Sequence, residues 1–143
     1  ARAWWLFRLF GHERVAVLEE QAAASELRGF LGPEEAQLLG RVLDGSILAA
    51  PREAIQGSGY VLHCLEASLW AAERGRGFRE SVLLAVNLGD DTDTTAAVTG
   101  AICGAMYGLR GIPEEWLATL VRGDMVRALA EQLAAKILEG RGA

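Results

Sequence analysis

Three carboxylates and three threonines are crowded into one short stretch of the chain, Asp90-Asp91-Thr92-Asp93-Thr94-Thr95. An apolar segment ends just before it, at Asn87-Leu88-Gly89, and a segment of small residues follows. Carboxylates at this density repel one another, and burial would raise their pKa values, so water, hydrogen bonds or a cation must keep them ionised. Carboxylate and hydroxyl oxygens are hard ligands, which favours Mg²⁺, Mn²⁺ or Ca²⁺ over zinc.

Two interpretations of this acidic stretch are open from the residues alone. Asp and Thr are common at helix N-termini, where they cap backbone N–H groups without any metal. Alternatively, Asp91 stands just before a helix, with Asp93 and Thr94 in its first turn. In that arrangement the three side chains converge on one point, and the start of the helix relieves part of their negative charge. The pattern supports capping and cation binding equally.

The composition indicates a folded protein, with 51% hydrophobic and 23% charged residues. The formal net charge is -5, and the basic residues are scattered along the chain. A nucleic-acid surface needs clustered basic residues, so we expect no nucleic-acid partner. No apolar run approaches the roughly 20 residues that span a bilayer, and no signal-type pattern follows the apolar opening. We therefore expect a cytoplasmic protein with no membrane partner.

Three further residues could suggest chemistry of their own. Cys64 and Cys103 each lie in an apolar run, which favours buried thiols over the alternative of one disulfide. Neither cysteine has a base at recognisable spacing, so a nucleophilic role is disfavoured. His63 has no Cys or His partner at ligand spacing, which favours a structural role.

Helix is the expected secondary structure throughout the chain. Ala, Leu and Glu dominate, period-2 alternation is absent, and Gly and Pro divide the chain into about seven helical segments. The chain is therefore predicted to be all-α. The predicted helices cover Ala1–Phe10, Glu13–Arg28, Pro33 to about Leu43, Tyr60–Arg74, Phe78–Leu88 and Asp93–Tyr107, with further helices beginning at Pro113 and capped by Asp124.

Three of these segments carry patterns that predict packing. Phe78–Leu88 is apolar on nearly all sides, which predicts a central helix. Glycines recur every four residues along Asp93–Tyr107 and just after it, which leaves one face without side chains, so that another backbone can approach closely; they are Gly100, Gly104 and Gly108. The last helix should present one apolar stripe, made of Val126, Leu129, Leu133 and Ile137.

The order and spacing of these motifs resemble the ADP-ribosylglycohydrolase (dinitrogenase reductase-activating glycohydrolase-like) family. The run from Asn87 to Ala97 is similar to the C-terminal metal motif of that family, and the likeness continues to Gly111-Ile112-Pro113-Glu114-Glu115-Trp116. Upstream, Ser58-Gly59-Tyr60-Val61 and Leu65-Glu66-Ala67 resemble the stretch that precedes the motif. The resemblance covers about Gln56 to Leu120 and is faint before Gln56.

The resemblance implies a compact, orthogonal multi-helix bundle and a hydrolase that removes ADP-ribose from modified proteins or related ADP-ribosyl compounds. Members bind a pair of magnesium ions, with Mn²⁺ as an alternative metal. By analogy, Asp91, Asp93 and Thr94 are metal ligands in this chain. Asp90 stands where many relatives have glycine, and it is not counted as a ligand.

The resemblance also implies that Ser58, Gly59 and Tyr60 contact ADP-ribose, with the Tyr60 ring stacking on the ligand. The alternative for these residues is a plain turn, followed by an aromatic side chain that starts a helix and packs in the core. Their type and spacing alone do not decide between the two.

One departure from the family limits this assignment. The N-terminal Thr-Asp-Asp-type motif and its Gly-Asp-Ala-like turn are not found, so the catalytic residues are unknown and half of the metal site is expected elsewhere. We therefore expect residues 1–143 to be a single all-helical domain or the C-terminal half of one, completed by an N-terminal segment or a second chain.

Two other functions compete with the hydrolase interpretation. The first is a non-catalytic helical module, or inactive fragment, that binds ADP-ribose or a protein partner. The second is a prenyl-diphosphate enzyme, because such enzymes are also helical and have Asp-rich magnesium sites. The second is disfavoured because its acids recur as Asp-Asp-x-x-Asp, usually in two copies, whereas this chain has a single Asp-Asp-x-Asp.

Overall fold

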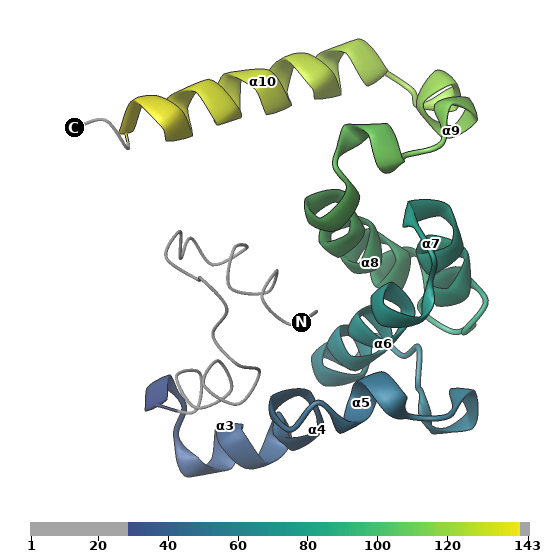
Figure 1. The fold of residues 1–143 in the computed structure, drawn as a ribbon, viewed down its shortest axis with the longest axis vertical. Coiled ribbons are helices and arrows are strands. Elements are labelled where there is room, and N and C mark those ends of the chain that lie inside the picture. Colours follow the sequence, from purple (N-terminus) through teal and green to yellow (C-terminus); the bar gives the residue numbers. More distant parts are fainter. Residues whose placement is uncertain (1–28, 141–143) are drawn as a thin grey trace. The chain divides into compact units, whose positions relative to one another are not determined.

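The computed structural model describes residues 29–140, with side chains as far as Lys136, and these residues form helices and turns without a strand (Figure 1). The all-α class predicted from the sequence is confirmed. The described residues form two compact units, which divide between Gly111 and Ile112 in the sequence. The helices predicted at 1–10 and 13–28 lie outside the described residues.

Short helices open the first unit: α3 (Pro33–Leu38), α4 (Gly40–Leu43), α5 (Ser46–Ala49) and the 3-10 turn η1 (Arg52–Ala54). Proline begins α3 as predicted, because the first helical position needs no N–H partner. The single helix predicted from Pro33 to about Leu43 is broken at Leu39, where ψ changes to 10°. Glycine follows at position 40 and weakens the helix further.

Three longer helices form the main part of the first unit: α6 (Val61–Arg74), α7 (Phe78–Val86) and α8 (Thr92–Tyr107). The 3-10 turn η2 (Leu109–Gly111) follows α8. The three helices pack against one another in every pairing (Figure 1). Their observed ends differ from the predicted ends by at most two residues. Apolar periodicity, glycine and proline were therefore sufficient to locate these elements.

Helix α6 lies at the centre of the described core. Its buried residues are Cys64, Ala67, Ser68, Leu69, Trp70, Ala71 and Ala72. By contrast, α7 buries only Phe78, Ser81 and Ala85, and Val86 is exposed. The prediction that 78–88 forms the central helix is therefore wrong for the described part of the chain, because α7 turns a single face inward.

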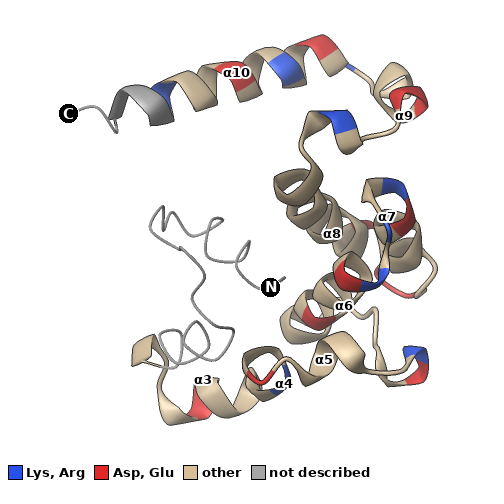
Figure 2. Ribbon diagram, in the orientation of Figure 1, with Lys and Arg blue, Asp and Glu red and all other residues tan. Residues whose placement is uncertain are grey.

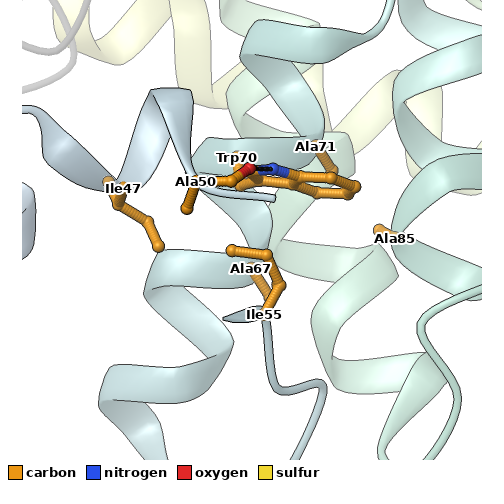
Figure 3. Close-up of a cluster of buried hydrophobic side chains, with 7 residues drawn as sticks. All are labelled: Ile47, Ala50, Ile55, Ala67, Trp70, Ala71 and Ala85. Carbon is orange, nitrogen blue, oxygen red and sulfur yellow. Dashed lines mark hydrogen bonds between the residues drawn. The ribbon is translucent and has the colours of Figure 1, made fainter. Parts of the chain in front are cut away.

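A cluster of buried apolar side chains surrounds Trp70 (Figure 3). The indole Nε1–H of Trp70 donates to the Ala50 carbonyl at 2.9 Å, which provides the partner that a buried indole needs. The remaining members of the cluster are Ile47, Ala50, Ile55, Ala67, Ala71 and Ala85. The cluster holds the segment around residues 50–55 against α6, and the loop at 57–60 follows directly from it.

The small residues of α8 do not have the role that was expected. A Cβ built on Gly100 would lie 3.9 Å from the Phe78 ring, and one on Gly104 would meet no atom within 4 Å. The close backbone approach predicted for this glycine face is therefore not found among the described residues. The prediction for the cysteines is confirmed, because Cys64 and Cys103 are both buried free thiols.

The second unit contains α9 (Glu114–Thr119) and α10 (Gly123–Gly140). Pro113 was predicted to be the first residue of this helix. It is instead the N-cap, and α9 begins one residue later, at Glu114. Asp124 lies inside the first turn of α10 rather than capping it, because the helix already begins at Gly123. Charges of opposite sign alternate along α10 (Figure 2), namely Asp124, Arg127, Glu131 and Lys136.

The apolar stripe predicted for the last helix is present on α10 but is exposed in the structure. Val126, Leu129 and Leu133 are 47%, 56% and 60% exposed, and the side chain of Ile137 lies outside the described residues. Among the described helices, none combines the length and the apolar composition that a membrane-crossing segment requires.

Candidate metal and ligand site

The turn between α7 and α8 presents the acidic stretch. Gly89 and Asp90 both have left-handed backbones, with φ of 84° and 61°. Glycine adopts this conformation freely, and aspartate is one of the few other residues that tolerate it. Asp91 then becomes the N-cap of α8, with Asp93 in the first turn of the helix. The placement that the sequence predicted for Asp91, Asp93 and Thr94 is therefore found.

Asp91 and Asp93 form an acidic pair at the start of α8. A hydrogen bond with the Asp91 side chain lowers the pKa of the Asp93 carboxyl, and the backbone N–H groups of Asp93 and Thr94 lower it further. The small cost of desolvation opposes this shift. Asp93 and Thr94 are exposed, whereas Asp91 is half-buried. The structure thus keeps an ionised carboxylate at the surface beside a second carboxyl group.

The loop at residues 57–60 lies directly against this pair. The Asp91 N–H donates to the Gly57 carbonyl at 2.9 Å. A Cβ built on Gly59 would lie 2.8 Å from the Asp91 Oδ2 atom, and one on Gly57 would lie 2.7 Å from the Gly89 carbonyl oxygen. Only glycine allows this approach without displacing the neighbour. The structure therefore brings together two motifs that are more than thirty residues apart.

Ser58 and Tyr60 are arranged around the first turn of α6. The Ser58 hydroxyl and the Nδ1 atom of His63 are hydrogen bonded at 2.8 Å, and the Tyr60 N–H donates to the same hydroxyl at 3.4 Å. The Tyr60 ring meets His63 edge-on, with 5.1 Å between ring centroids, and Tyr60 remains 51% exposed. Tyr60 is thus not a core residue. His63 has a structural partner, Ser58, which the sequence alone did not reveal.

Buried hydroxyl groups connect the start of α8 to α6. The Thr95 hydroxyl donates to the Asp91 carbonyl at 2.9 Å, and the Ser68 hydroxyl donates to the Thr95 carbonyl at 3.2 Å. Thr99 donates to the same Thr95 carbonyl at 2.8 Å. The sequence analysis missed these supporting residues. The four-residue spacing of Thr95 and Thr99 was the one local signal, because helical hydroxyls can bond the carbonyl four positions earlier.

A further supporting residue, Arg52, was also missed. Its Nη2 group donates to the carbonyl oxygens of Asn87 and Leu88 at 3.3 and 2.9 Å. These carbonyls stand at the end of α7, immediately before the turn that leads to Asp91. No sequence rule signals this contact, because Arg52 is separated from its partners by 35 and 36 residues.

The donor set at this site fits part of the shell of a hard cation. The two carboxylates and the Thr94 hydroxyl are oxygen donors of the kind that Mg²⁺ and Mn²⁺ prefer. Within residues 29–136, however, no group of three or more His, Cys, Asp and Glu side chains is arranged to hold a metal ion. The described residues therefore offer one side of such a site, and Mg²⁺ commonly completes its octahedral shell with water and other ligands.

An all-helical fold with an aspartate pair at a helix start, facing a glycine-containing loop, has the features of the glycohydrolase class indicated by the sequence motifs. The family model described as ADP-ribosylglycohydrolase matches residues 3–142. The chain belongs to the ADP-ribosylglycohydrolase family. This match also includes the segment before Gln56, where the motif resemblance was faint.

Several curated relatives are similar to a little more than half of the chain. The chain is 50% identical over 82 residues to ADP-ribosylarginine hydrolase Tri1 of Serratia proteamaculans. These 82 residues are 57% of this chain and 22% of that protein. It is 43% identical over the same length to Tri1 of Pseudomonas putida, with the same coverage of both proteins. It is 40% identical over 73 residues to ADP-ribosylhydrolase ARH3 of Danio rerio, or 51% of this chain and 20% of that protein. The matched stretch thus spans about a fifth of these relatives.

Proposed function

We propose that the protein containing this chain is a magnesium-dependent hydrolase that removes ADP-ribose from modified proteins or related ADP-ribosyl compounds. The observation that carries this proposal is the contact between the two predicted motifs, in which the backbone at Gly59 lies against the Asp91 carboxylate. Family membership supports it, as do the names of the relatives, an ADP-ribosylarginine hydrolase and an ADP-ribosylhydrolase.

In this proposal, Asp91, Asp93 and Thr94 hold Mg²⁺ from one side. Bound Mg²⁺ would orient the ribose and polarise the bond to be cleaved. The Asp93 side chain is exposed and nothing in its surroundings raises its pKa overall, so its carboxylate is ionised and can bind a cation at neutral pH. The Asp91 carboxylate lies in the space that a side chain at position 59 would otherwise occupy. The remaining ligands and the catalytic acid or base are expected outside the described residues.

The 58–60 loop is proposed to contact the ADP-ribose beside this cation. Tyr60 offers a half-exposed ring that is held by a T-shaped contact with His63, and an exposed aromatic ring is suited to stacking. The Ser58 hydroxyl is held in place by His63 and by the Tyr60 N–H. The loop and the cation site would therefore bind neighbouring parts of one ligand.

A charge-matched pair of variants tests the proposal. Asp93→Asn removes a proposed ligand, whereas Asp90→Asn removes the same charge three residues earlier and keeps a side chain that tolerates the φ of 61°. Mn²⁺ binding by titration calorimetry and release of ADP-ribose by the full gene product should both fall in Asp93→Asn, by about tenfold or more in affinity. Asp90→Asn should resemble the wild type. Equal behaviour of the two variants would contradict the proposed ligand set.

A non-catalytic binding module is the second candidate, because the described residues contribute only two carboxylates to the cation site. The same measurements separate the two functions. Binding of ADP-ribose without its release from any ADP-ribosylated substrate by the full gene product, with or without Mg²⁺, would favour the binding module. Magnesium-dependent release would favour the hydrolase.

A further inference from the structure

Arg52 connects the η1 turn to the end of α7. One guanidinium nitrogen donates to two successive carbonyl oxygens, those of Asn87 and Leu88, at 3.3 and 2.9 Å. Helix C-termini leave their last carbonyls without partners, and a cationic donor there satisfies them and interacts favourably with the helix dipole. The ordinary interpretation of this contact is therefore a helix cap that adds a little stability.

The position of the capped carbonyls indicates a more specific role. Leu88 is followed by Gly89 and Asp90, whose left-handed backbones turn the chain into the N-cap Asp91. On the far side of this turn, the Asp91 N–H donates to the Gly57 carbonyl at 2.9 Å. Arg52 and Gly57 belong to the same short segment of chain, so this segment holds the turn at both of its ends.

We propose that Arg52 is a positioning residue for the cation site, which acts by fixing the α7–α8 turn and thereby the Asp91 and Asp93 carboxylates. This inference rests on the proposed cation site. Arg52 contacts only backbone atoms of the turn in the hydrogen bonds described, so its effect would reach the carboxylates through the conformation of the main chain. Asp90, the non-glycine residue of the turn with a left-handed backbone, is the one whose conformation depends most on such external support.

The chain contains a matched control for this hypothesis. Arg74 makes the same contact at the end of α5, where its Nη2 group donates to the carbonyls of Ala49 and Ala50 at 3.3 and 2.9 Å. Arg74 also lies over the Trp70 ring, at 5.6 Å from its centroid. Loss of Arg74 should therefore cost the fold at least as much as loss of Arg52. Arg74 caps the helix that precedes the Arg52 segment and makes no bond to the acidic turn itself in the hydrogen bonds described, so its loss should affect the cation site less than the loss of Arg52.

The test compares Arg52→Gln with Arg74→Gln in the full gene product. Mn²⁺ affinity should fall about tenfold in Arg52→Gln, as is typical when an outer support of a metal site is lost, and should fall much less in Arg74→Gln. Hydrogen exchange of the Asp91 amide, measured by NMR without metal, should accelerate more in Arg52→Gln than in Arg74→Gln. Arg52→Lys should restore part of the affinity, because a single nitrogen makes both bonds in the wild type.

The possible outcomes separate this inference from the proposed function. Equal Mn²⁺ affinity and equal Asp91 exchange in the two glutamine variants would overturn the positioning role and leave the cation site standing. A wild type that binds no Mn²⁺ would overturn the proposed site and, with it, the role assigned to Arg52. Thermal unfolding of each variant confirms that the protein remains folded during the comparison, which the exposed position of Arg52 favours.

Discussion

At Gly59, the lack of a side chain lets the backbone lie against the Asp91 carboxylate, because an added Cβ would come within 2.8 Å of Oδ2. The atom that would have to move is the end of a side chain and not part of the backbone. A small substitution at Gly59 should therefore displace the carboxylate while leaving the fold almost intact. This separation of site geometry from stability makes Gly59 an informative position.

We predict that Gly59→Ala weakens Mn²⁺ binding by about tenfold, with little change in melting temperature. Gly104→Ala is the control, because a Cβ there meets no atom of the described residues within 4 Å and alanine favours the helix by about 0.5–1 kcal/mol. That variant should be as stable as the wild type or more so, with unchanged affinity. Calorimetric titration and thermal unfolding measure both quantities. Loss of stability without loss of affinity in Gly59→Ala would contradict the prediction.

The pKa of Asp93 leads to a prediction about pH. Since the folded state lowers this pKa below 3.8, the ionised carboxylate stabilises the fold above that value, and this contribution is lost as pH falls through the lower, folded pKa. Without metal, the melting-temperature difference between wild type and Asp93→Asn should be constant from about pH 7 to pH 5 and should shrink below about pH 4. A difference that already shrinks near neutral pH would indicate a raised pKa instead.

Sequence reasoning located the acidic residues because capping is a local property. Asp91 and Asp93 are placed by the helix that begins between them, and a few neighbouring residues are enough to predict that helix. The role of Arg52 could not be predicted in this way, because its partners are 35 and 36 residues distant and are backbone carbonyls that any residue would provide. Whether the acidic residues bind a cation remains a prediction.

At the scale of elements, the start of α8 is attached to α6 by hydroxyl groups as well as by apolar packing. The Asp91 carbonyl accepts both the N–H and the hydroxyl of Thr95, at 3.2 and 2.9 Å, and the Thr95 carbonyl accepts the Ser68 hydroxyl. Thr95 and Ser68 are fully buried, so the Ser68 bond is shielded from water, and the bond from the Thr95 hydroxyl to Asp91 is partly shielded. The helix that carries the proposed ligands is therefore anchored within its first turn.

We predict that Thr95→Val destabilises the protein by about 1 kcal/mol, because valine keeps the shape of threonine but leaves the Asp91 carbonyl with one donor fewer. Thr119→Val is the matched control. Its hydroxyl makes the same kind of bond, to the Glu115 and Trp116 carbonyls at 3.2 and 3.0 Å, but Thr119 is exposed and water can replace the bond. Urea unfolding of both variants measures the difference, and equal effects would show that the buried bond contributes no more than the exposed one.

The elements themselves were predictable to different degrees. The long helices α6, α7 and α8 were located within two residues, since periodicity, glycine and proline define segments of that length. The break at Leu39 was missed, because two short helices and one longer helix have the same apolar pattern over so few residues. The central helix was also predicted wrongly. Most of the buried residues of α6 are small or polar, so its sequence does not look strongly hydrophobic.

At the scale of the whole molecule, burial is unequal between the helices. Helix α6 buries seven residues, whereas the described side chains of α10 from Asp124 to Lys136 are all exposed. An amphipathic stripe on a helix indicates which face favours apolar contact, but it does not indicate whether that face is covered. For this reason the sequence predicted the stripe of α10 correctly and could not predict its exposure.

This inequality predicts how the chain unfolds locally. An exposed helix is held mainly by its own hydrogen bonds and opens locally, whereas a buried helix opens only when the core does. In hydrogen exchange measured by mass spectrometry, peptides from 64–72 of α6 should exchange slowest, and those from 124–136 of α10 should exchange much faster. If α10 were protected as strongly as α6, its apolar stripe would be covered in solution, and dilution of the protein would then show whether a second copy provides that cover.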